Sequence, residues 1–297
     1  MSLSTRVLSG LAVVAIAGAV GTTAVHAQTE RSVYASVLDK AGAPVGALTA
    51  NDFTVREDGV SREVLRAVRA DDPLQIAVLV DTSQAVERHV SDIRRALKGF
   101  VREMSGGHEI ALVGFGERPT VLTDYTSDPA RLEAGIGRLF ARPGSGAYAL
   151  DAIVDASRAL RNREGARHVI VLITTEGPEF SNRYHEQVLD EFRTSATLQS
   201  FVLNRRGVPR LDDARRQREL TVAEGTVLTG GRREHLLTSM ALEDRLRDLA
   251  VELKNQYRVD YSRPSALMPP ERLDVGVKRS ELTVRAPRVP RTVRTGS

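Results

Sequence analysis

Aliphatic runs alternate with amphipathic stretches through most of the chain. The runs Ile76–Val80, Ile110–Phe115 and His168–Thr174 are rich in Val, Ile and Leu, as is typical of strands buried on both faces of a sheet. Between them lie stretches with hydrophobic residues at helical spacing, such as Val86–Met104. Strands that alternate with helices in this way predict a Rossmann-like, doubly wound and mostly parallel sheet.

The same alternation continues toward the C-terminus. We expect a strand at Leu198–Leu203, a short extended piece at Glu234–Leu237 and a long helix from Leu242 to about Gln256. One exception to the parallel order is predicted at Thr120–Tyr125, which follows the second buried strand closely enough to pair with it in antiparallel fashion.

Hydrophobic residues at both ends of this region recur instead at every second position. Ser32–Ala70 predicts three or four strands, too few to bury a face by themselves. Strand character returns at 257–286, and we expect the two flanks to form one β-sandwich-like module. The predicted organisation is an N-terminal β module at 32–70, an α/β domain at 74–256, C-terminal strands at 257–286 and a disordered tail at 287–297.

The first residues have the pattern of a targeting segment. Arg6 precedes the long run of apolar and small residues Val7–Val25, and Val25-His26-Ala27 offers a small-residue cleavage site. This pattern predicts a secretory signal peptide at 1–27 and a periplasmic or secreted protein that is not inserted in a membrane after cleavage. Retention of the same segment as a membrane anchor is the alternative.

Composition narrows the classes of function. The 297 residues include no Cys, which excludes disulfides, thiolate metal sites and Cys nucleophiles. The net charge of +4 comes from basic and acidic residues that are interspersed, and without a basic stripe and aromatic platforms we expect no nucleic-acid partner. No nucleophile elbow, phosphate loop or paired metal-binding His motif is present, so we expect no enzyme activity and assign no catalytic residue.

Three of the four adjacent Arg pairs lie in the second half of the chain. They are Arg205-Arg206, Arg215-Arg216 and Arg232-Arg233. We interpret them as solvated faces, with contact to an acidic protein or to the envelope surface as the alternative.

Polar residues follow the first buried strand directly. Asp81, Thr82 and Ser83 come after Ile76–Val80, where open α/β sheets bind their ligands. With these residues the chain, from about Val33 to about Arg285, resembles the von Willebrand factor A-type domain. The likeness is strongest to bacterial secreted proteins in which a short β module precedes that domain. It also rests on three further stretches, Leu48–Gly59, Thr229–Arg232 and Leu253–Tyr261.

The resemblance implies a divalent-cation site at the strand ends, built in the family from Asp-x-Ser-x-Ser, a loop Thr and a later Asp. Asp81 and Ser83 match this pattern, whereas Ala85 and Ala147 stand at two hydroxyl positions and Glu176 at the last carboxylate. Methyl groups cannot coordinate Mg²⁺, which takes about six oxygen ligands. We therefore expect a degenerate metal site with Asp81, Ser83 and Glu176 as its remnant, and no tightly bound cofactor.

These observations together predict a secreted or periplasmic, non-enzymatic protein-interaction protein of adhesion or scaffold type, with a protein partner of unknown identity. Its binding surface would be the loops Asp81–Ala85, Gly144–Ala147 and Thr175–Pro178. Two alternatives stay open: a working Mg²⁺-dependent adhesion domain that recruits Ser145 or Thr175, and a purely structural envelope scaffold.

Overall fold

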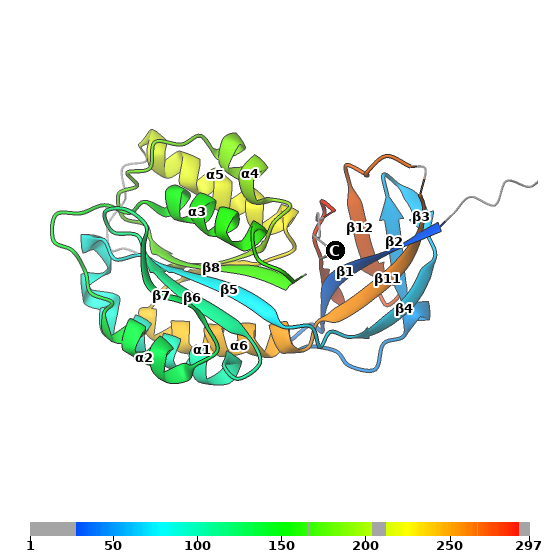
Figure 1. Ribbon diagram of the computed structural model, residues 1–297, viewed down its shortest axis with the longest axis horizontal. Coiled ribbons are helices and arrows are strands. Elements are labelled where there is room, and N and C mark those ends of the chain that lie inside the picture. The colour runs from blue at the N-terminus through cyan, green and yellow to red at the C-terminus, as the bar shows by residue number, and fades with distance from the viewer. Residues whose placement is uncertain (1–27, 166, 204–211, 266, 291–297) are drawn as a thin grey trace, which may run out of the picture.

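The chain folds into an α/β lobe and a β lobe that lie side by side (Figure 1). The computed structural model describes residues 28–165, 167–203, 212–265 and 267–290. The predicted signal peptide at 1–27, the pair Arg205-Arg206 and residues 291–297 of the predicted tail lie outside the described residues.

The α/β lobe is built on a six-stranded sheet with the order β10-β9-β8-β5-β6-β7. Neighbouring strands pair in parallel except β6 and β7, which are antiparallel. This order confirms the predicted doubly wound, mostly parallel fold, including the antiparallel strand after the second buried run. The strands are β5 (Leu74–Val80), β6 (Glu109–Gly114), β7 (Thr120–Thr126), β8 (Arg167–Thr175), β9 (Thr197–Leu203) and β10 (Arg233–Leu236).

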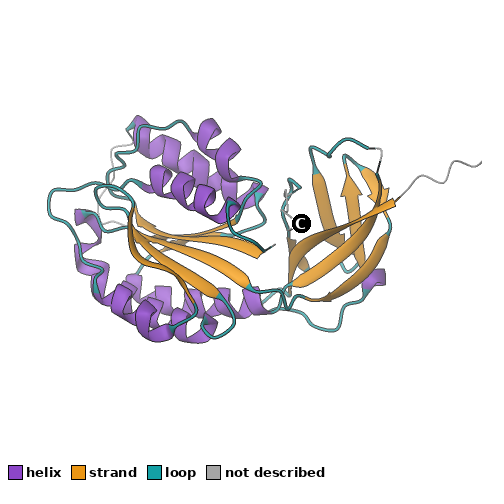
Figure 2. Cartoon of the chain, in the orientation of Figure 1, coloured by secondary structure: helices purple, strands orange, loops and turns teal. Residues whose placement is uncertain are grey.

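Helices cover both faces of this sheet (Figure 2). They are α1 (Val90–Met104), α2 (Pro129–Gly137), α3 (Ala149–Arg161), α4 (His185–Phe192), α5 (Asp213–Leu228) and α6 (Leu242–Lys254), with short 3-10 turns η1 (Ala50–Asp52), η2 (Gln84–His89) and η3 (Ser239–Ala241). One hydrophobic cluster contains residues of α1, α2 and α6, and a second contains residues of α3, α4 and α5. None of the helices in the described part of the chain combines the length and the apolar character that a membrane span requires.

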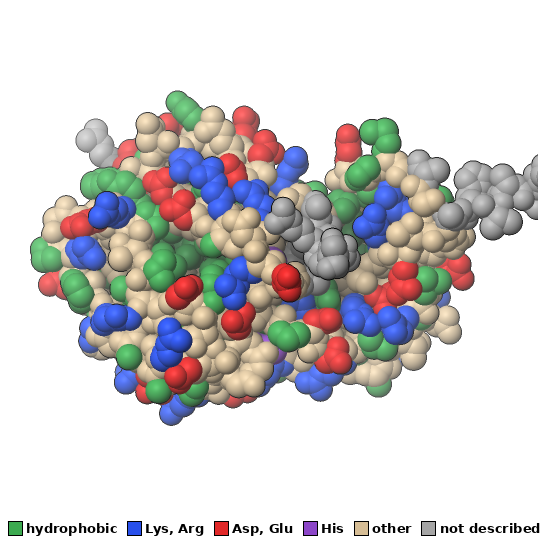
Figure 3. All heavy atoms as spheres, viewed as in Figure 1, with side chains coloured by type: hydrophobic (Ala, Val, Ile, Leu, Met, Phe, Trp, Pro, Cys, Tyr) green, Lys and Arg blue, Asp and Glu red, His purple; other side chains and the backbone are tan. Residues whose placement is uncertain are grey.

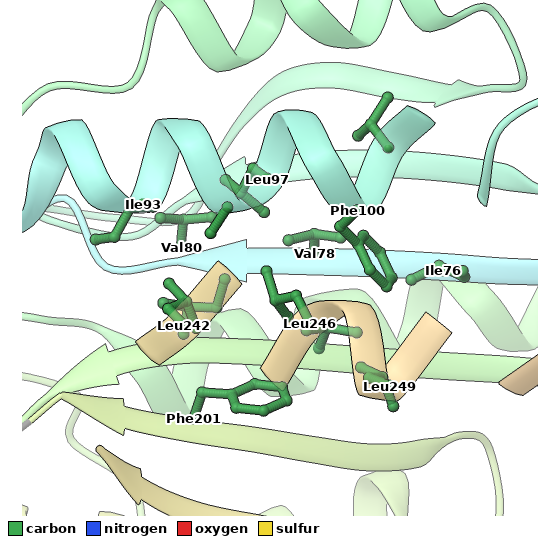
Figure 4. Packing of buried hydrophobic residues seen from close by; sticks show 14 of the residues in the cluster. Ile76, Val78, Val80, Ile93, Leu97, Phe100, Phe201, Leu242, Leu246 and Leu249 are labelled. Atoms are coloured by element: carbon green, nitrogen blue, oxygen red, sulfur yellow. The ribbon is translucent and has the colours of Figure 1, made fainter. Parts of the chain in front are cut away.

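The first cluster shows how the patterned residues become a core. Leu97 and Phe100 of α1 and Leu246 of α6 gather over β5, with Phe201 of β9 beside them (Figure 4). All four side chains are at most 1% exposed. Because helix-spaced hydrophobics and strand hydrophobics meet there, the periodicity of the sequence is sufficient to position this layer.

The predicted helix Val86–Met104 begins later than its pattern indicates. Residues Gln84–His89 form the 3-10 turn η2, and the α-helix starts at Val90. Ser83 caps the turn by accepting a hydrogen bond from the Ala85 backbone N–H (3.3 Å). A side-chain oxygen that accepts from a free backbone N–H in this way marks the start of a helix. Here it marks the start of the 3-10 turn η2, which precedes the α-helix.

The β lobe combines strands from both ends of the chain. One sheet has the order β13-β1-β11-β4 and the other the order β12-β2-β3. Each sheet therefore joins N-terminal and C-terminal strands, which supplies the partners that Ser32–Ala70 lacks and confirms the predicted β-sandwich-like module. The strands are β1 (Gln28–Leu38), β2 (Phe53–Glu57), β3 (Val60–Arg62), β4 (Val64–Arg69), β11 (Tyr257–Pro264), β12 (Leu273–Val277) and β13 (Thr283–Arg285).

Arg167, the first residue of β8, ties the two lobes together. Its guanidinium donates to the backbone oxygens of Asp72 (2.7 Å), in the connection between β4 and β5, and of Leu253 (2.6 Å), in the last turn of α6. It also lies over the ring of Tyr34 in β1, 5.4 Å from the centroid. Burial lowers the pKa of Arg167 from its ordinary value.

The start of the predicted disordered tail is ordered. The Arg288 backbone N–H donates to the Leu228 carbonyl (2.8 Å), and the Arg288 carbonyl accepts from Leu273 N–H (2.8 Å). A side chain on Gly230 would lie 2.3 Å from the Ala286 carbonyl carbon. Residues 286–288 therefore pack between the end of α5 and the start of β12, because backbone hydrogen bonds offset the composition that favours disorder.

Candidate functional site

The strand order places the ends of β5 and β8 next to each other. The chain continues from β5 to β6 on one side and from β8 to β9 on the other. In doubly wound sheets, ligands bind at the carboxyl ends of the strands where the connections diverge in this way. This edge lies at the end of the molecule farthest from the β lobe (Figure 1).

Asp81 joins the two central strands at this edge. Its Oδ1 accepts from Ser83 N–H (2.8 Å), and its Oδ2 accepts from the Thr175 hydroxyl (3.0 Å) and the Thr175 N–H (3.2 Å). The side chain of Asp81 is 1% exposed. Thr175, one of the two residues that the alternative Mg²⁺-dependent site would recruit, is therefore an internal partner of the carboxylate.

The structure brings the three predicted loops into contact. Gln84 N–H donates to the Ser145 carbonyl (3.3 Å), and Ala147 N–H donates to the Pro178 carbonyl (2.9 Å). The methyl group of Ala85 lies so close to Gly177 that a side-chain carbon on this glycine would be only 2.5 Å away from it. Backbone hydrogen bonds and close packing thus hold the three loops against one another.

The remaining predicted residues take different positions in this arrangement. Ala147 is fully buried. Glu176 comes directly after Thr175, the residue that bonds to Asp81, and is partly exposed. Its backbone oxygen accepts a hydrogen bond from Arg215 Nη1 (3.4 Å). Among the residues that the structure describes, no group of three or more His, Asp or Glu side chains could hold a metal ion.

A buried ion pair lies directly behind these loops. Glu179 is 3% exposed and Arg218 of α5 is 7% exposed. Arg218 donates to Glu179 Oε2 (3.4 Å) and to the Gly177 carbonyl (3.2 Å). Glu179 Oε1 accepts from the backbone N–H groups of Ala149 (3.1 Å) and Ser181 (3.2 Å). The pair therefore fastens the segment after β8 to both α3 and α5.

The environment of Glu179 favours its neutral form. Burial raises the pKa of Glu179 from 4.5 to about 7, while Arg218 and the hydrogen bonds from Ser181 act in the opposite direction. The charge of Asp81 contributes a smaller upward shift.

Sequence reasoning missed this pair. Glu179 lies just beyond the loop that the family pattern covers, and Arg218 lies in a helix whose many charges favour a solvated face. The interpretation of the Arg pairs is also wrong for Arg215 and Arg232, whose side chains are each 11% exposed. Their aliphatic stems pack while their guanidinium groups reach carbonyls or acids. For Arg215, the spacing with Arg218 and Val222 along one face of α5 could have indicated this.

Large hydrophobic side chains are exposed around the same edge. They are Val121 (63%), Phe140 (57%), Phe180 (53%), Tyr184 (61%), Leu237 (87%) and Met240 (69%). Each belongs to a segment at the carboxyl edge of the sheet, and Figure 3 shows hydrophobic side chains distributed over this end of the molecule. Exposed hydrophobic residues that gather on one part of a surface indicate an interaction site, whereas single ones do not.

Phe180 is held in place although it is exposed. Its ring lies against Gly146, where a side-chain carbon would come within 2.8 Å of the ring. The ring of Tyr148 meets it edge-on, with the centroids 6.1 Å apart. The neighbouring surface is hollowed by a pocket of about 490 Å³ that is lined by Gln84, Ala85, Glu87, Arg88, His89, Ser145 and Pro178. The edge thus combines a fixed aromatic ring with a polar hollow.

Comparison with known proteins agrees with this architecture. Residues 76–177 match the family model of the von Willebrand factor type A domain. The fold is similar to that of a von Willebrand factor type A protein from Catenulispora acidiphila, with a TM-score of 0.53 and 13% identity over 84% of this chain and 75% of that chain. It is also similar to proximal thread matrix protein 1 from the mussel byssus, solved with a zinc-occupied MIDAS motif, with a TM-score of 0.50 and 15% identity over 67% of this chain and 49% of that chain. The curated proteins include no match.

The doubly wound sheet, with its polar residues at the switch point, defines an A-type α/β domain. The chain carries a von Willebrand factor type A domain, which confirms the resemblance inferred from its sequence. Domains of this family often serve in adhesion or protein interaction and are generally not enzymes.

Proposed function

We propose that this protein is a secreted or periplasmic, non-enzymatic interaction protein that binds a protein partner through the carboxyl edge of its α/β sheet. The observation that carries the proposal is the exposure of three aromatic side chains, Phe140, Phe180 and Tyr184, in connections at that edge. Aromatic side chains are enriched among the residues that dominate binding energy at protein interfaces. The predicted signal peptide at 1–27 supports the location.

A degenerate metal site supports recognition without a bridging cation. Asp81 uses both carboxylate oxygens in hydrogen bonds within the protein, and Ala85 and Ala147 supply methyl groups where the family has hydroxyls. Because Mg²⁺ requires about six oxygen ligands, this donor set does not fit a tightly held ion. Glu179 offers no catalytic alternative, since it is paired with Arg218 and almost fully buried.

Titration with Mg²⁺ or Mn²⁺ tests the degenerate site. We expect calorimetry of the native protein to detect no saturable binding. The triple variant Ala85→Ser, Ala147→Thr and Glu176→Asp should gain binding, because it restores two hydroxyl ligands and the shorter carboxylate of the family pattern. Adding Asp81→Ala to that variant should abolish the gain. Micromolar binding by the native protein that disappears in Asp81→Ala would contradict the proposal and favour a working adhesion site.

Substitution of the exposed aromatics tests the interaction surface. Immobilised protein should capture a partner from envelope extract of the source cell, and Phe140→Ser combined with Phe180→Ser should reduce the captured amount about tenfold or more. The matched control is Val60→Ser with Leu65→Ser, which removes two exposed hydrophobics (56% and 46%) from the β lobe. Equal capture by both double variants would instead favour a structural scaffold that does not bind through this edge.

A further inference from the structure

A second cavity lies far from the strand-end loops, where the β lobe meets the α/β lobe. It has a volume of about 360 Å³ and is bordered by residues of β1, β2, β11, β12 and the segment 287–290, with Thr194 of the α/β lobe on its other side. Figure 1 shows β1 and β12 on the side of the β lobe that faces the α/β lobe. Junctions between domains, and volumes of roughly 300–1,000 Å³, are typical of small-molecule sites.

The cavity exists because one sheet of the sandwich is incomplete. β13 pairs with β1 only at Ser36–Leu38, so the longer part of β1 before Ser36 has a described strand, β11, on one side only. After Arg285 the chain turns away and bonds to the end of α5 through Arg288. The mouth between the two sheets is therefore left open beside Arg31–Tyr34.

The inner end of the cavity is charged. Glu57 is 1% exposed and accepts from the Tyr261 hydroxyl (3.1 Å), from Arg263 Nε (3.0 Å) and from Arg62 Nε (2.9 Å). Arg31 adds an exposed guanidinium at the lining. Two guanidinium groups, Arg31 and Arg263, and one carboxylate, Glu57, line the cavity, so its lining carries one excess positive charge.

Arg263 has hydrogen-bonding capacity left for an anion. Its Nη2 donates to the carbonyls of Leu267 (3.0 Å) and Met268, and its Nε donates to Glu57. Its Nη1 has no hydrogen-bond partner among the described residues. Arg263 thus lines the cavity, is only 6% exposed and keeps one free donor group. A guanidinium in this position can bind a carboxylate.

The other walls are apolar. Val33, Leu273, Val289 and the prolines Pro269, Pro270, Pro287 and Pro290 line them. We propose that this cavity binds a small amphipathic carboxylic acid, with its carboxylate at Arg31 and Arg263 and its hydrocarbon body against Val33, Leu273 and Val289.

Residues 291–297 are poorly suited to occupy the cavity themselves. Their charged side chains are Arg291 and Arg294, which would be repelled by the arginines of the lining, and they include no acidic side chain.

The test uses 4-phenylbutyrate as the probe and the chain that remains after removal of 1–27. Calorimetry should show saturable binding, and NMR should show shifts of the Val33 and Leu273 methyl signals. Arg31→Glu should weaken binding about tenfold or more, and so should replacing the probe by uncharged 4-phenylbutanol. The matched control is Arg56→Glu, which makes the same change of charge at an exposed position of β2 outside the cavity and should leave the affinity unchanged.

Three outcomes would overturn the proposal. One is the absence of methyl shifts at saturating probe, and another is equal weakening by Arg31→Glu and Arg56→Glu, which would indicate general attraction to a basic surface. The third is binding that occurs only in a chain ending at Pro290, which would assign the cavity to residues 291–297. Thermal unfolding of each variant should match the native protein, because both Arg31 and Arg56 are exposed.

Discussion

Replacing Arg218 by Met is expected to lower the free energy of unfolding by about 3 kcal/mol at pH 8, at the low end of the cost of breaking a buried ion pair. The substitution leaves Glu179 3% exposed and without its cation, so at pH 8 its carboxylate must either stay charged in the interior or take up a proton. It also removes the donor to the Gly177 carbonyl. Both outcomes for the carboxylate are unfavourable, because a buried charge without a partner loses its hydration and protonation at pH 8 lies far above the ordinary pKa of 4.5 for this carboxyl.

The same variant should lose much less stability at pH 5.5. The folded protein raises the pKa of Glu179 to about 7, so the folded state binds this proton more tightly than the unfolded state. The stabilising contribution of that proton is fully present below the ordinary pKa of 4.5 and is lost as pH rises to about 7. At pH 5.5 Glu179 is mostly protonated, and removing Arg218 then leaves a neutral acid.

Urea unfolding at the two pH values measures the effect. Glu179→Gln combined with Arg218→Met should recover most of the loss at pH 8, because the amide oxygen can still accept from Ala149 and Ser181 N–H. Arg216→Met is the matched control, since Arg216 is an exposed neighbour on α5. A loss of equal size at pH 5.5 and pH 8 would show that Arg218 contributes through packing and not through charge.

Replacing Phe201 by Ala is expected to cost about 4 kcal/mol, within the range for removing a buried Phe side chain. Phe201 is fully buried in β9 and belongs to the cluster between the sheet and α6 (Figure 4). The Arg232 guanidinium lies over its ring, 5.6 Å from the centroid. The substitution therefore creates a cavity and also removes the aromatic surface that covers a largely buried cation.

Chemical denaturation followed by circular dichroism measures this loss. Phe201→Leu should cost clearly less, because most of the buried volume is kept. The control Leu237→Ala alters a side chain that is 87% exposed and should change stability by less than about 0.5 kcal/mol. A loss below about 1 kcal/mol for Phe201→Ala would mean that the layer between β9 and α6 collapses into the vacated space.

The ion pair between Arg218 and Glu179 also bears on the proposed interaction surface. Phe180 directly follows Glu179, and its N–H donates to the Ala147 carbonyl (2.7 Å). Fixing Glu179 therefore fixes the residue that presents the Phe180 ring. An interface residue that is already ordered before binding loses less conformational entropy when the partner arrives.

Periodicity alone predicted much of this fold, and its limits are visible in particular residues. The aliphatic runs around Val78, Leu112 and Val171 could be recognised because a strand buried on both faces needs apolar residues at successive positions. The start of α1 could not be placed, because the 3-10 turn before it has the same apolar spacing as a helix. Arg218 could not be recognised as buried, since its partner lies 39 positions away in the chain.

The sequence by itself determined the alternation of strands and helices, the need of the N-terminal strands for partners, and the loss of hydroxyl ligands at Ala85 and Ala147. These follow from local spacing and from residue chemistry, which do not depend on distant contacts. Only the tertiary structure decided that Asp81 bonds to Thr175, that Glu179 is buried with Arg218, and that the open side of β1 leaves a charged cavity. Each of these depends on segments that are far apart in the chain, and the free energy of burying a charge is defined only once its surroundings have been assembled.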